Sequence, residues 1–414
     1  MSCIPIQDFS LISLCDATKA GKLYSIVPDS GAGDFDVVRA TTATYLGSDG
    51  LLKTAANDEP RIEFNADGSY KGLLVEPAAT NLLLRSEEFD DAYWAKTNAT
   101  ITANNAVAPD GATTADKLVP DTSDAVHSVS RGAQPIGGGF YSVFAKADGY
   151  EWILLTSHSS SQSEQRGAFF NVKDGTIGAT GDGINAQIED YGNGWYRCSI
   201  SEGITPSSIW TVISTNADNV RRFEGNGTDG VLIWGAQNEQ GSVPTSYIPT
   251  VASTVTRAAD EISKTGASAL IGQTEGTLFV DFEELNYGDF PFTVYFRITD
   301  GSNNNRLRII RGTNINTIRV IYQLNGNVNQ FDLDNIPVNI GQRNKVAFVY
   351  KSGDIVVVVN GDIIGTSTNV LTISNTLSFL ELSNSNNDTP FKVKTVLLSK
   401  TRLSNAELEA LTTI

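Results

Sequence analysis

Short runs rich in Val, Ile, Thr and aromatic residues, separated by Gly, Asn, Asp and Ser, extend along nearly the whole chain. Residues 167–183 (GAFFNVKDGTIGATGDG) show the pattern, because two short runs are divided by a Lys-Asp-Gly turn and followed by a Gly-rich turn. Such runs are typical of antiparallel strands joined by tight turns. A helical period of apolar residues occurs only in the last dozen residues. The pattern predicts an all-β protein with one short C-terminal helix.

The length of 414 residues exceeds that of one ordinary sandwich and predicts two or three domains. The first 70 residues are the least regular, and an extended segment with Pro249 (residues 246–260) marks a boundary further along. We therefore divide the chain into an irregular N-terminal attachment segment with short strands (1–72), a jelly roll (73–262) and a second antiparallel sandwich (263–414). The two sandwiches are expected to follow one another in tandem.

Two long phrases are the most specific features: residues 72–94 (GLLVEPAATNLLLRSEEFDDAYW) and residues 235–250 (GAQNEQGSVPTSYIPT). Together they resemble a module of tailed-bacteriophage structural proteins, especially fibre and receptor-binding components. The resemblance covers about residues 38–262. It implies that the first phrase opens a carbohydrate-binding-like β jelly roll and that the second closes it. It also implies a virion protein that binds a glycan.

The last third of the chain resembles the laminin-G and concanavalin-A-like lectin group. Residues 276–282 (GTLFVDF) alternate as an opening strand, and the Val-rich run 355–359 is followed by an Asn-Gly hairpin turn. Residues 394–411 read as a closing strand and a helix, in which Ser404 and Glu407 have the spacing of a capping box. The resemblance implies a lectin-like sandwich that differs from the first one.

The formal net charge of -17 disfavours two classes of partner. Binding of nucleic acid or of anionic membranes requires concentrated Lys and Arg, so we expect neither a nucleic-acid surface nor membrane insertion. The three cysteines, Cys3, Cys15 and Cys198, do not form a disulfide framework. No signal peptide or membrane span is visible. We expect synthesis in the cytoplasm of a bacterial host and a final location on the virion surface.

The residues give no support to an enzymatic function. Hydrolases of the lectin-like fold carry a Glu-X-Asp-X-X-Glu strand, but the nearest string here (FVDFEE) has Phe279 at the first acid position. Asp281 and Glu283 then share one face, as is also common on a solvated strand edge. His127 and His158 stand in Ser-rich surroundings without a nucleophile elbow. Zinc spacing, a P-loop and a dinucleotide fingerprint are also missing. We expect no catalytic residues.

Aromatic rings that stack on sugars, with polar neighbours that reach hydroxyl groups, are the candidates for ligand binding. Two pairs fit: Tyr150 with Trp152, and Trp195 with Arg197. Alternation in residues 194–200 places Trp195 and Arg197 on the face opposite Cys198. Either face could be the core, because a jelly roll has two sheets. Packing is therefore the alternative for both members of this pair.

A structural calcium ion is the one cofactor that the jelly-roll resemblance suggests, between the opening and closing strands. Carboxylate oxygens are its preferred ligands. Glu87, Glu88 and Glu239 are the acids nearest to that location, and ordinary surface acids are the alternative. Residues 384–388 (NSNND) form a second candidate loop.

These features lead to the hypothesis of a fibre-type adhesin that binds host-surface or environmental glycans non-covalently. Its N-terminal segment would attach to other virion proteins, or would pack as an ordinary strand on its own domain. A homotrimer is expected by analogy with phage fibres. One alternative is a head-fibre or capsid decoration protein, and another is a polysaccharide depolymerase. The sequence does not distinguish a head from a tail location, nor one glycan from another.

Overall fold

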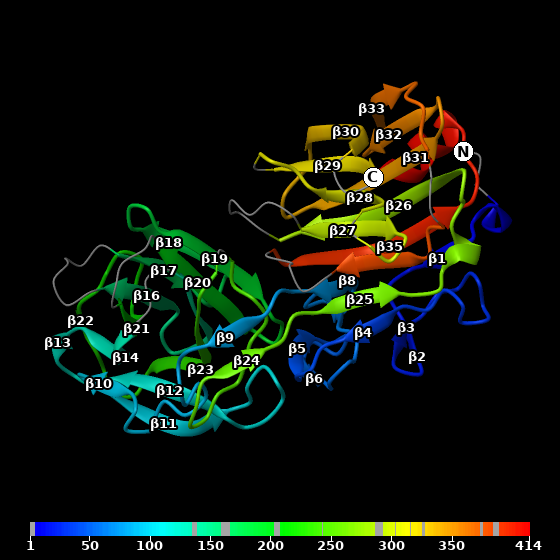
Figure 1. Cartoon of the computed structure of the whole chain (residues 1–414). Helices are drawn as coiled ribbons and strands as arrows, with labels where there is room; N and C mark the ends of the chain where they lie inside the picture. The colour runs from blue at the N-terminus through cyan, green and yellow to red at the C-terminus, as the bar shows by residue number, and fades with distance from the viewer. Residues whose placement is uncertain are drawn as a thin grey trace.

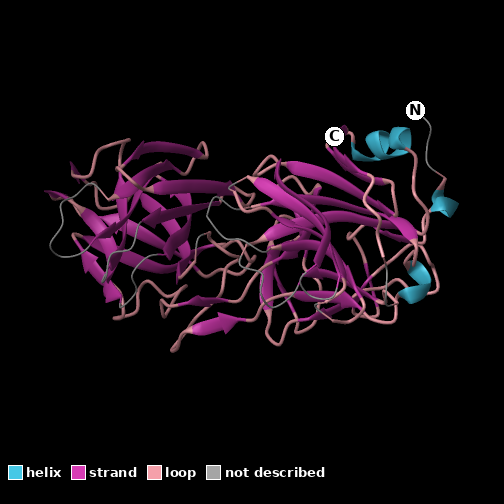
Figure 2. Ribbon diagram, turned by 45° about the horizontal axis from the view of Figure 1, so that its top comes forward, coloured by secondary structure: helices cyan, strands magenta, loops and turns pink. Residues whose placement is uncertain are grey.

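The computed structural model describes residues 5–134, 139–158, 166–202, 208–241, 243–285, 293–302, 304–314, 316–324, 328–372, 376–383 and 389–414. Strands dominate, as the sequence predicted, and Figure 2 shows that the helical turns lie at the end of the molecule that carries both termini. These turns are η1 (Ile6–Asp8), η2 (Ser268–Leu270) and α1 (Asn405–Thr412). In the described part of the chain, no helix is long and apolar enough to span a membrane.

One sandwich, which we call the inserted domain, is built from two six-stranded antiparallel sheets. The β16 sheet has the order β10 (Ala95–Thr97), β14 (His127–Gln134), β21 (Ser208–Thr215), β16 (Trp152–His158), β17 (Gly167–Asn171) and β18 (Thr176–Thr180). The β23 sheet has the order β11 (Ala99–Ala106), β12 (Ala115–Pro120), β23 (Gly230–Glu239), β15 (Gly139–Asp148), β20 (Tyr196–Glu202) and β19 (Asn185–Asp190). A small pair, β13 (Asp124–Ala125) with β22 (Phe223–Glu224), closes one end.

The other sandwich, the base domain, has two larger sheets. The β26 sheet has the order β33 (Asp362–Ser367), β32 (Ile355–Val359), β31 (Arg343–Lys351), β26 (Glu275–Glu284), β35 (Phe391–Ser399), β8 (Tyr70–Val75) and β7 (Ile62–Phe64), and β1 (Leu11–Ser13) also pairs with β35. The β28 sheet has the order β30 (Val328–Pro337), β29 (Thr317–Leu324), β28 (Arg306–Arg311), β27 (Val294–Thr299), β34 (Phe379–Ser383), β25 (Glu261–Lys264) and β4 (Asp36–Val38).

Three two-stranded antiparallel sheets contain the remaining strands of the described chain. They are β2 (Thr18–Lys19) with β3 (Lys22–Leu23), β5 (Ala43–Leu46) with β6 (Leu52–Ala55), and β9 (Ala79–Asn81) with β24 (Val255–Arg257). In Figure 1 the two domains lie side by side, with β9 and β24 at their boundary. The chain therefore enters the inserted domain through one strand of a pair and leaves it through the other.

The strand pairing differs from the three consecutive parts expected from the sequence (1–72, 73–262 and 263–414), because strands of the first part belong to the same sheets as strands of the third. Strands β4 and β8 from the first 75 residues hydrogen-bond to β25 and β35 and so extend the two sheets of the base domain. Val37 and Leu73 enter the same core as the C-terminal strands. The base domain is discontinuous, and the jelly roll is an insertion between β8 and β25. The N-terminal segment is thus packed into a domain, which was the alternative to a separate attachment arm.

In each sandwich, side chains that alternate along the strands form a buried core between the two sheets. Cys198 and Ile200 of β20 point into the core of the inserted domain, as the sequence predicted. Trp94 and Trp234 are buried structural residues. In the base domain, α1 begins at a capping box in which Ser404 and Glu407 satisfy one another's backbone amides. Leu408 of α1 packs on the outer face of the β26 sheet, so this helix covers that face.

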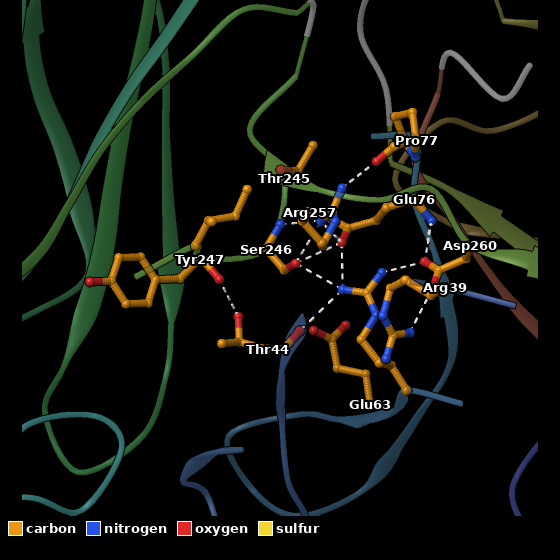
Figure 3. A network of polar contacts seen from close by, with 12 residues as sticks. Arg39, Thr44, Glu63, Glu76, Pro77, Thr245, Ser246, Tyr247, Arg257 and Asp260 are labelled. Carbon is orange, nitrogen blue, oxygen red and sulfur yellow. Dashed lines mark hydrogen bonds and ion pairs between the residues drawn. The ribbon is translucent and has the colours of Figure 1, made fainter. Parts of the chain in front are cut away.

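A buried polar network fixes the boundary between the domains (Figure 3). The Glu76 carboxylate accepts hydrogen bonds from the amide and hydroxyl of Ser246, at 2.7 Å each, and pairs with Arg61 and Arg257. Asp260 pairs with Arg61 and, at 2.8 Å, with Arg39. Charges removed from water are tolerated when they are paired and hydrogen-bonded. Since Glu76 and Arg257 stand on the outgoing and returning chains, the network joins both crossings to the base domain.

Candidate functional site

Trp195 and Arg197 lie in a second, smaller core on the outer face of the β23 sheet. Trp195 is 2% exposed and packs with Phe144, Trp234 and Tyr247. Its indole Nε1 donates to the Val107 carbonyl at 3.1 Å. The structure places both side chains of this predicted ligand pair in a packed interior, which is the arrangement that the packing alternative requires.

Arg197 is equally enclosed. Its guanidinium donates to the Thr245 carbonyl at 2.6 Å and to the Ser142 hydroxyl at 3.0 Å, and it lies 5.6 Å from the centre of the Phe144 ring. Thr245 belongs to the segment of residues 243–250, which closes the jelly-roll phrase and lies over this face. This returning segment and β6 cover the outer face of the β23 sheet. Side chains on both faces of β20 are therefore buried, so the alternation in this strand does not distinguish an interior face from a solvent-exposed one.

Tyr150 and Trp152 do not form one platform. Trp152, at the start of β16, packs on the outer face of the β16 sheet with Leu154, Phe169 and Ile213. Tyr150 precedes the strand and packs at the margin of the main core, edge-on to Phe223 with ring centroids 5.1 Å apart. The structure thus places the two rings in different clusters. Of the four predicted ligand residues, Trp195 and Arg197 are buried, whereas Tyr150 and Trp152 are partly exposed. Trp152 is the one that packs on the outer face of the β16 sheet.

A cavity of about 440 Å³ lies on that outer face of the β16 sheet. Its floor is apolar and comes from Leu154 on β16 and Phe169 on β17, which point away from the main core. Its rim is polar and comes from the loops that follow β18 and β21. The lining residues are Leu154, Gly167, Phe169, Ala179, Thr180, Gly181, Asp182, Asn219 and Arg221. We call this cavity the β16 groove.

The loop after β21 is tied to β18, which gives the groove a fixed wall. Asp218 accepts a hydrogen bond from the Ala179 amide at 2.8 Å. The next residue, Asn219, has a left-handed backbone with φ of 57°, a conformation that Asn tolerates better than most residues. Gly178 makes room for this contact, because an added Cβ would lie 2.7 Å from both the Asp218 carboxyl carbon and the Trp152 ring. The wall therefore depends on Gly at 178.

The groove joins the elements that a small polar ligand requires. Its size falls within the range of pockets that hold small molecules. Its floor can cover the apolar face of a sugar ring, and Asp182, Asn219 and Arg221 can exchange hydrogen bonds with hydroxyl groups. Sequence reasoning missed these three rim residues, because they stand in loops without a period. The one available signal was the Gly-rich turn at the end of residues 167–183, which contains Asp182.

The three acids proposed for calcium do not fit a calcium site. Glu87 accepts from the Tyr247 hydroxyl at 2.9 Å, and Glu88 pairs with Arg85 at 2.7 Å. Glu239 is buried, its pKa is raised by that burial, and it accepts from the Thr245 amide at 2.8 Å and hydroxyl at 2.6 Å. No group of three or more His, Cys, Asp and Glu side chains suited to a metal occurs among the described residues. The candidate loop 384–388 lies outside them.

Two of the residues weighed for catalysis, Asp281 and His127, are engaged in structural contacts. Asp281 accepts two hydrogen bonds from Arg343 Nε, at 2.8 and 2.9 Å. Both ring nitrogens of His127 face backbone carbonyl oxygens, of Asn98 at 2.6 Å and of Phe223 at 2.9 Å. The His158 side chain lies outside the described part. The expectation of no enzymatic function stays a prediction.

Comparison with known proteins gave no match to a family model and none to a curated protein. Solved structures similar to part of the chain include the binding domain of a serotype D/C botulinum neurotoxin (12% identity, 37% of this chain and 40% of that chain, TM-score 0.31). Another is a CBM40 of the Ruminococcus gnavus IT-sialidase bound to α2,3-sialyllactose (18% identity, 35% of this chain and 86% of that chain, TM-score 0.29). A third is domain 4 of AbnA, a Geobacillus stearothermophilus arabinanase, in complex with arabinotriose (16% identity, 42% of this chain and 84% of that chain, TM-score 0.30). The chain thus spans less than half of the neurotoxin domain's length.

Proposed function

We propose that this chain is a glycan-binding adhesin whose inserted domain holds a saccharide non-covalently in the β16 groove. The observation that carries the proposal is the groove itself, with the apolar floor of Leu154 and Phe169 and the polar rim of Asp182, Asn219 and Arg221. Shallow saccharide sites of this kind bind weakly one at a time. An oligomer, such as the trimer expected by analogy, would raise the avidity through a high effective concentration.

The finer proposal is that the adhesin belongs to the surface of a tailed-phage virion. Its support is the resemblance carried by residues 72–94 and 235–250. Both phrases contribute to the domain boundary, because Glu76 of the first phrase and Ser246 of the second are hydrogen-bonded in the buried network there. A fixed boundary would present the groove in one orientation relative to the base domain and to whatever virion protein the base domain contacts.

The same observation favours a second candidate, a capsid decoration or head-fibre protein. The residues that carry the resemblance lie in the domain boundary, in segment 243–250 and in the core of the inserted domain, and none of them lines the groove. A protein selected for particle architecture would need those features even without a ligand. Cleavage of a glycan is the less supported role, because Asp182 is the only carboxylate among the described groove residues and hydrolysis usually needs two.

The test is a binding assay of the labelled full chain on an array of neutral and acidic oligosaccharides and on bacterial cells before and after periodate oxidation. Arg221→Ala should weaken binding by about tenfold, the effect of a lost charged hydrogen bond. Arg222→Ala is the matched control, since this neighbour is exposed and pairs with Asp124 at 3.3 Å away from the groove. Saturable, periodate-sensitive binding that falls only in Arg221→Ala supports the adhesin. Absence of saccharide binding at millimolar concentration would leave the decoration protein as the better candidate.

A further inference from the structure

Four arginines lie together on the outer face of the β28 sheet, in a chain of net charge -17. Arg297 on β27 stands directly opposite Arg308 on β28, and Arg306 lies two residues before it on the same strand. Arg319 on β29 extends the row. The alternate residues of β28, Leu307 and Ile309, enter the main core, so the arginines share the opposite face. We call this set the arginine face.

Like charges directly opposite one another destabilise a strand pair, so this arrangement requires compensation. The acids provide it at the two margins of the row. Glu381 pairs with Arg297 on one side, and Asp332 accepts from Arg319 Nε at 2.7 Å on the other. The margins remain in contact with solvent, because the side chains of Arg319 and Asp332 are 26% and 27% exposed.

The centre of the row has a neutral partner. Arg306 Nε donates to the side-chain carbonyl of Gln323 at 2.7 Å, and Arg308 reaches the same oxygen at 3.4 Å. The Nε atom of Arg308 is buried, and no residue in the described part of the chain accepts a hydrogen bond from it. Two guanidinium groups therefore converge on one amide oxygen, which carries no negative charge.

The electrostatics agree with this geometry. Burial, together with the positive charges of Arg306, Arg297 and Arg319, lowers the pKa of Arg308 to about 9. Burial and Arg297 likewise lower the pKa of Arg306. A bound anion would reverse both effects, because an opposite charge within a few ångströms favours the charged form of a base.

We propose that the arginine face is a second binding site, centred on Arg306 and Arg308, that takes the carboxylate or sulfate group of an acidic saccharide. A planar guanidinium fork matches these oxyanions with two parallel hydrogen bonds. Glu381 and Asp332 at the margins and the net negative charge of the chain would repel a long polyanion such as nucleic acid, so the site suits one compact anionic group. That the group belongs to a saccharide rests on the proposed function, whereas the anion site does not.

The experiment uses the full chain and three probes: sodium sulfate, tri-galacturonate, and galactotriose as the neutral counterpart. Isothermal titration should show binding of tri-galacturonate that weakens with salt and falls about tenfold or more in Arg308→Gln. Sulfate should raise the Tm of the wild type and not that of the variant. Arg222→Gln is the control, because it removes the same charge at an exposed position of the other domain.

Arg308→Gln is expected to fold, and without ligand to match or exceed the wild type in Tm, since it relieves the repulsion from Arg297. Equal affinity of Arg308→Gln and Arg222→Gln for tri-galacturonate would overturn the proposal, as would a wild type that responds to neither anion. Galactotriose binding that depends on Arg221 and not on Arg308 would uphold the β16 groove independently. Failure of this site is therefore distinguishable from failure of the adhesin.

Discussion

The two sheets of the inserted domain carry similar side chains on their outer faces, but only one of these faces is open. Trp195 and Arg197 lie beside the β23 sheet under residues of β6 and the returning segment 243–250. On the β16 sheet, Phe169 lines a cavity of about 440 Å³, and Trp152 belongs to the same outer cluster. Alternation with core residues therefore does not by itself show that an aromatic residue binds a ligand. What decides its role is whether a distant part of the chain covers it.

The largest effect is expected on the covered face. Trp195→Ala should lower the free energy of unfolding by about 3–5 kcal/mol, because it opens a cavity among Phe144, Trp234 and Tyr247. Trp152→Ala, on the open face, should cost clearly less, since this ring is only partly buried. Urea unfolding followed by circular dichroism measures both. Equal losses for the two variants would remove the distinction between the faces.

Acid should loosen segment 243–250, which covers the outer face of the β23 sheet, because it protonates Glu76. Although burial opposes its ionisation, Arg257 and Arg61 lower the pKa of Glu76 to about 2, from an ordinary value of 4.5. The depressed pKa means that the ionised form stabilises the fold above pH 4.5 and that this stabilisation is lost as the pH falls from 4.5 towards 2. The full contribution is about 3 kcal/mol. The protection factors of the amides in segment 243–250, which are corrected for the intrinsic pH dependence of hydrogen exchange, should fall between pH 6 and pH 3 as the Ser246 contacts weaken.

Glu88→Gln is the control for that measurement, because Glu88 forms an exposed pair with Arg85 away from the network. It should keep the pH dependence of the wild type. Protection factors of segment 243–250 that stay constant between pH 6 and pH 3 would show that Glu76 does not hold this segment in place.

A smaller effect should follow from Gly178→Ala on the open face. The new methyl group would lie 2.7 Å from the Asp218 carboxyl carbon and from the Trp152 ring, and closer still to Asp218 Oδ1, so it displaces the wall that carries Asn219. Saccharide affinity should fall by roughly threefold to tenfold, which corresponds to about 1 kcal/mol. Gly132→Ala, on β14 of the same sheet, is the control, since its added Cβ meets nothing within 4 Å. Loss of affinity in both variants would indicate a general defect of the sheet.

The smallest effect is expected from calcium. A bound ion at one hundred times its Kd would stabilise the fold by about 2.7 kcal/mol. Because Glu87, Glu88 and Glu239 have separate protein partners, we expect neither calcium nor EDTA to change the Tm. A Tm that rises with calcium and falls with EDTA would contradict this expectation and would direct attention to acids elsewhere in the chain.

Local chemistry was readable without the structure. The capping box of Ser404 and Glu407 and the hairpin turn at Asn360 and Gly361, both with positive φ, involve residues within a few positions of each other. The alternation around Cys198 also predicted that Trp195 and Arg197 lie on the face opposite Cys198, without deciding which of the two faces meets the main core. Each of these features depends on one strand or one turn, so the pattern of neighbouring residues contains the information.

Domain boundaries and the candidate site were not readable in the same way. Arg39 and Asp260, which pair at 2.8 Å, are 221 positions apart, and the three-residue strand β4 finds its partner in β25. Contacts over such separations leave no period in the sequence. Similarly, Asp182 and Arg221 line one groove only because β18 and the loop after β21 are brought together.

The sequence by itself determined the all-β class, several strands of both sandwiches and the C-terminal helix, because side-chain alternation and capping act between near neighbours. Only the tertiary structure decided that the jelly roll is inserted into a discontinuous base domain, which outer face remains open, and where the arginines gather. These properties depend on which distant strands pair and which segments cover them. Burial of a side chain is a property of the whole packed chain, and alternation alone specifies only that two faces exist.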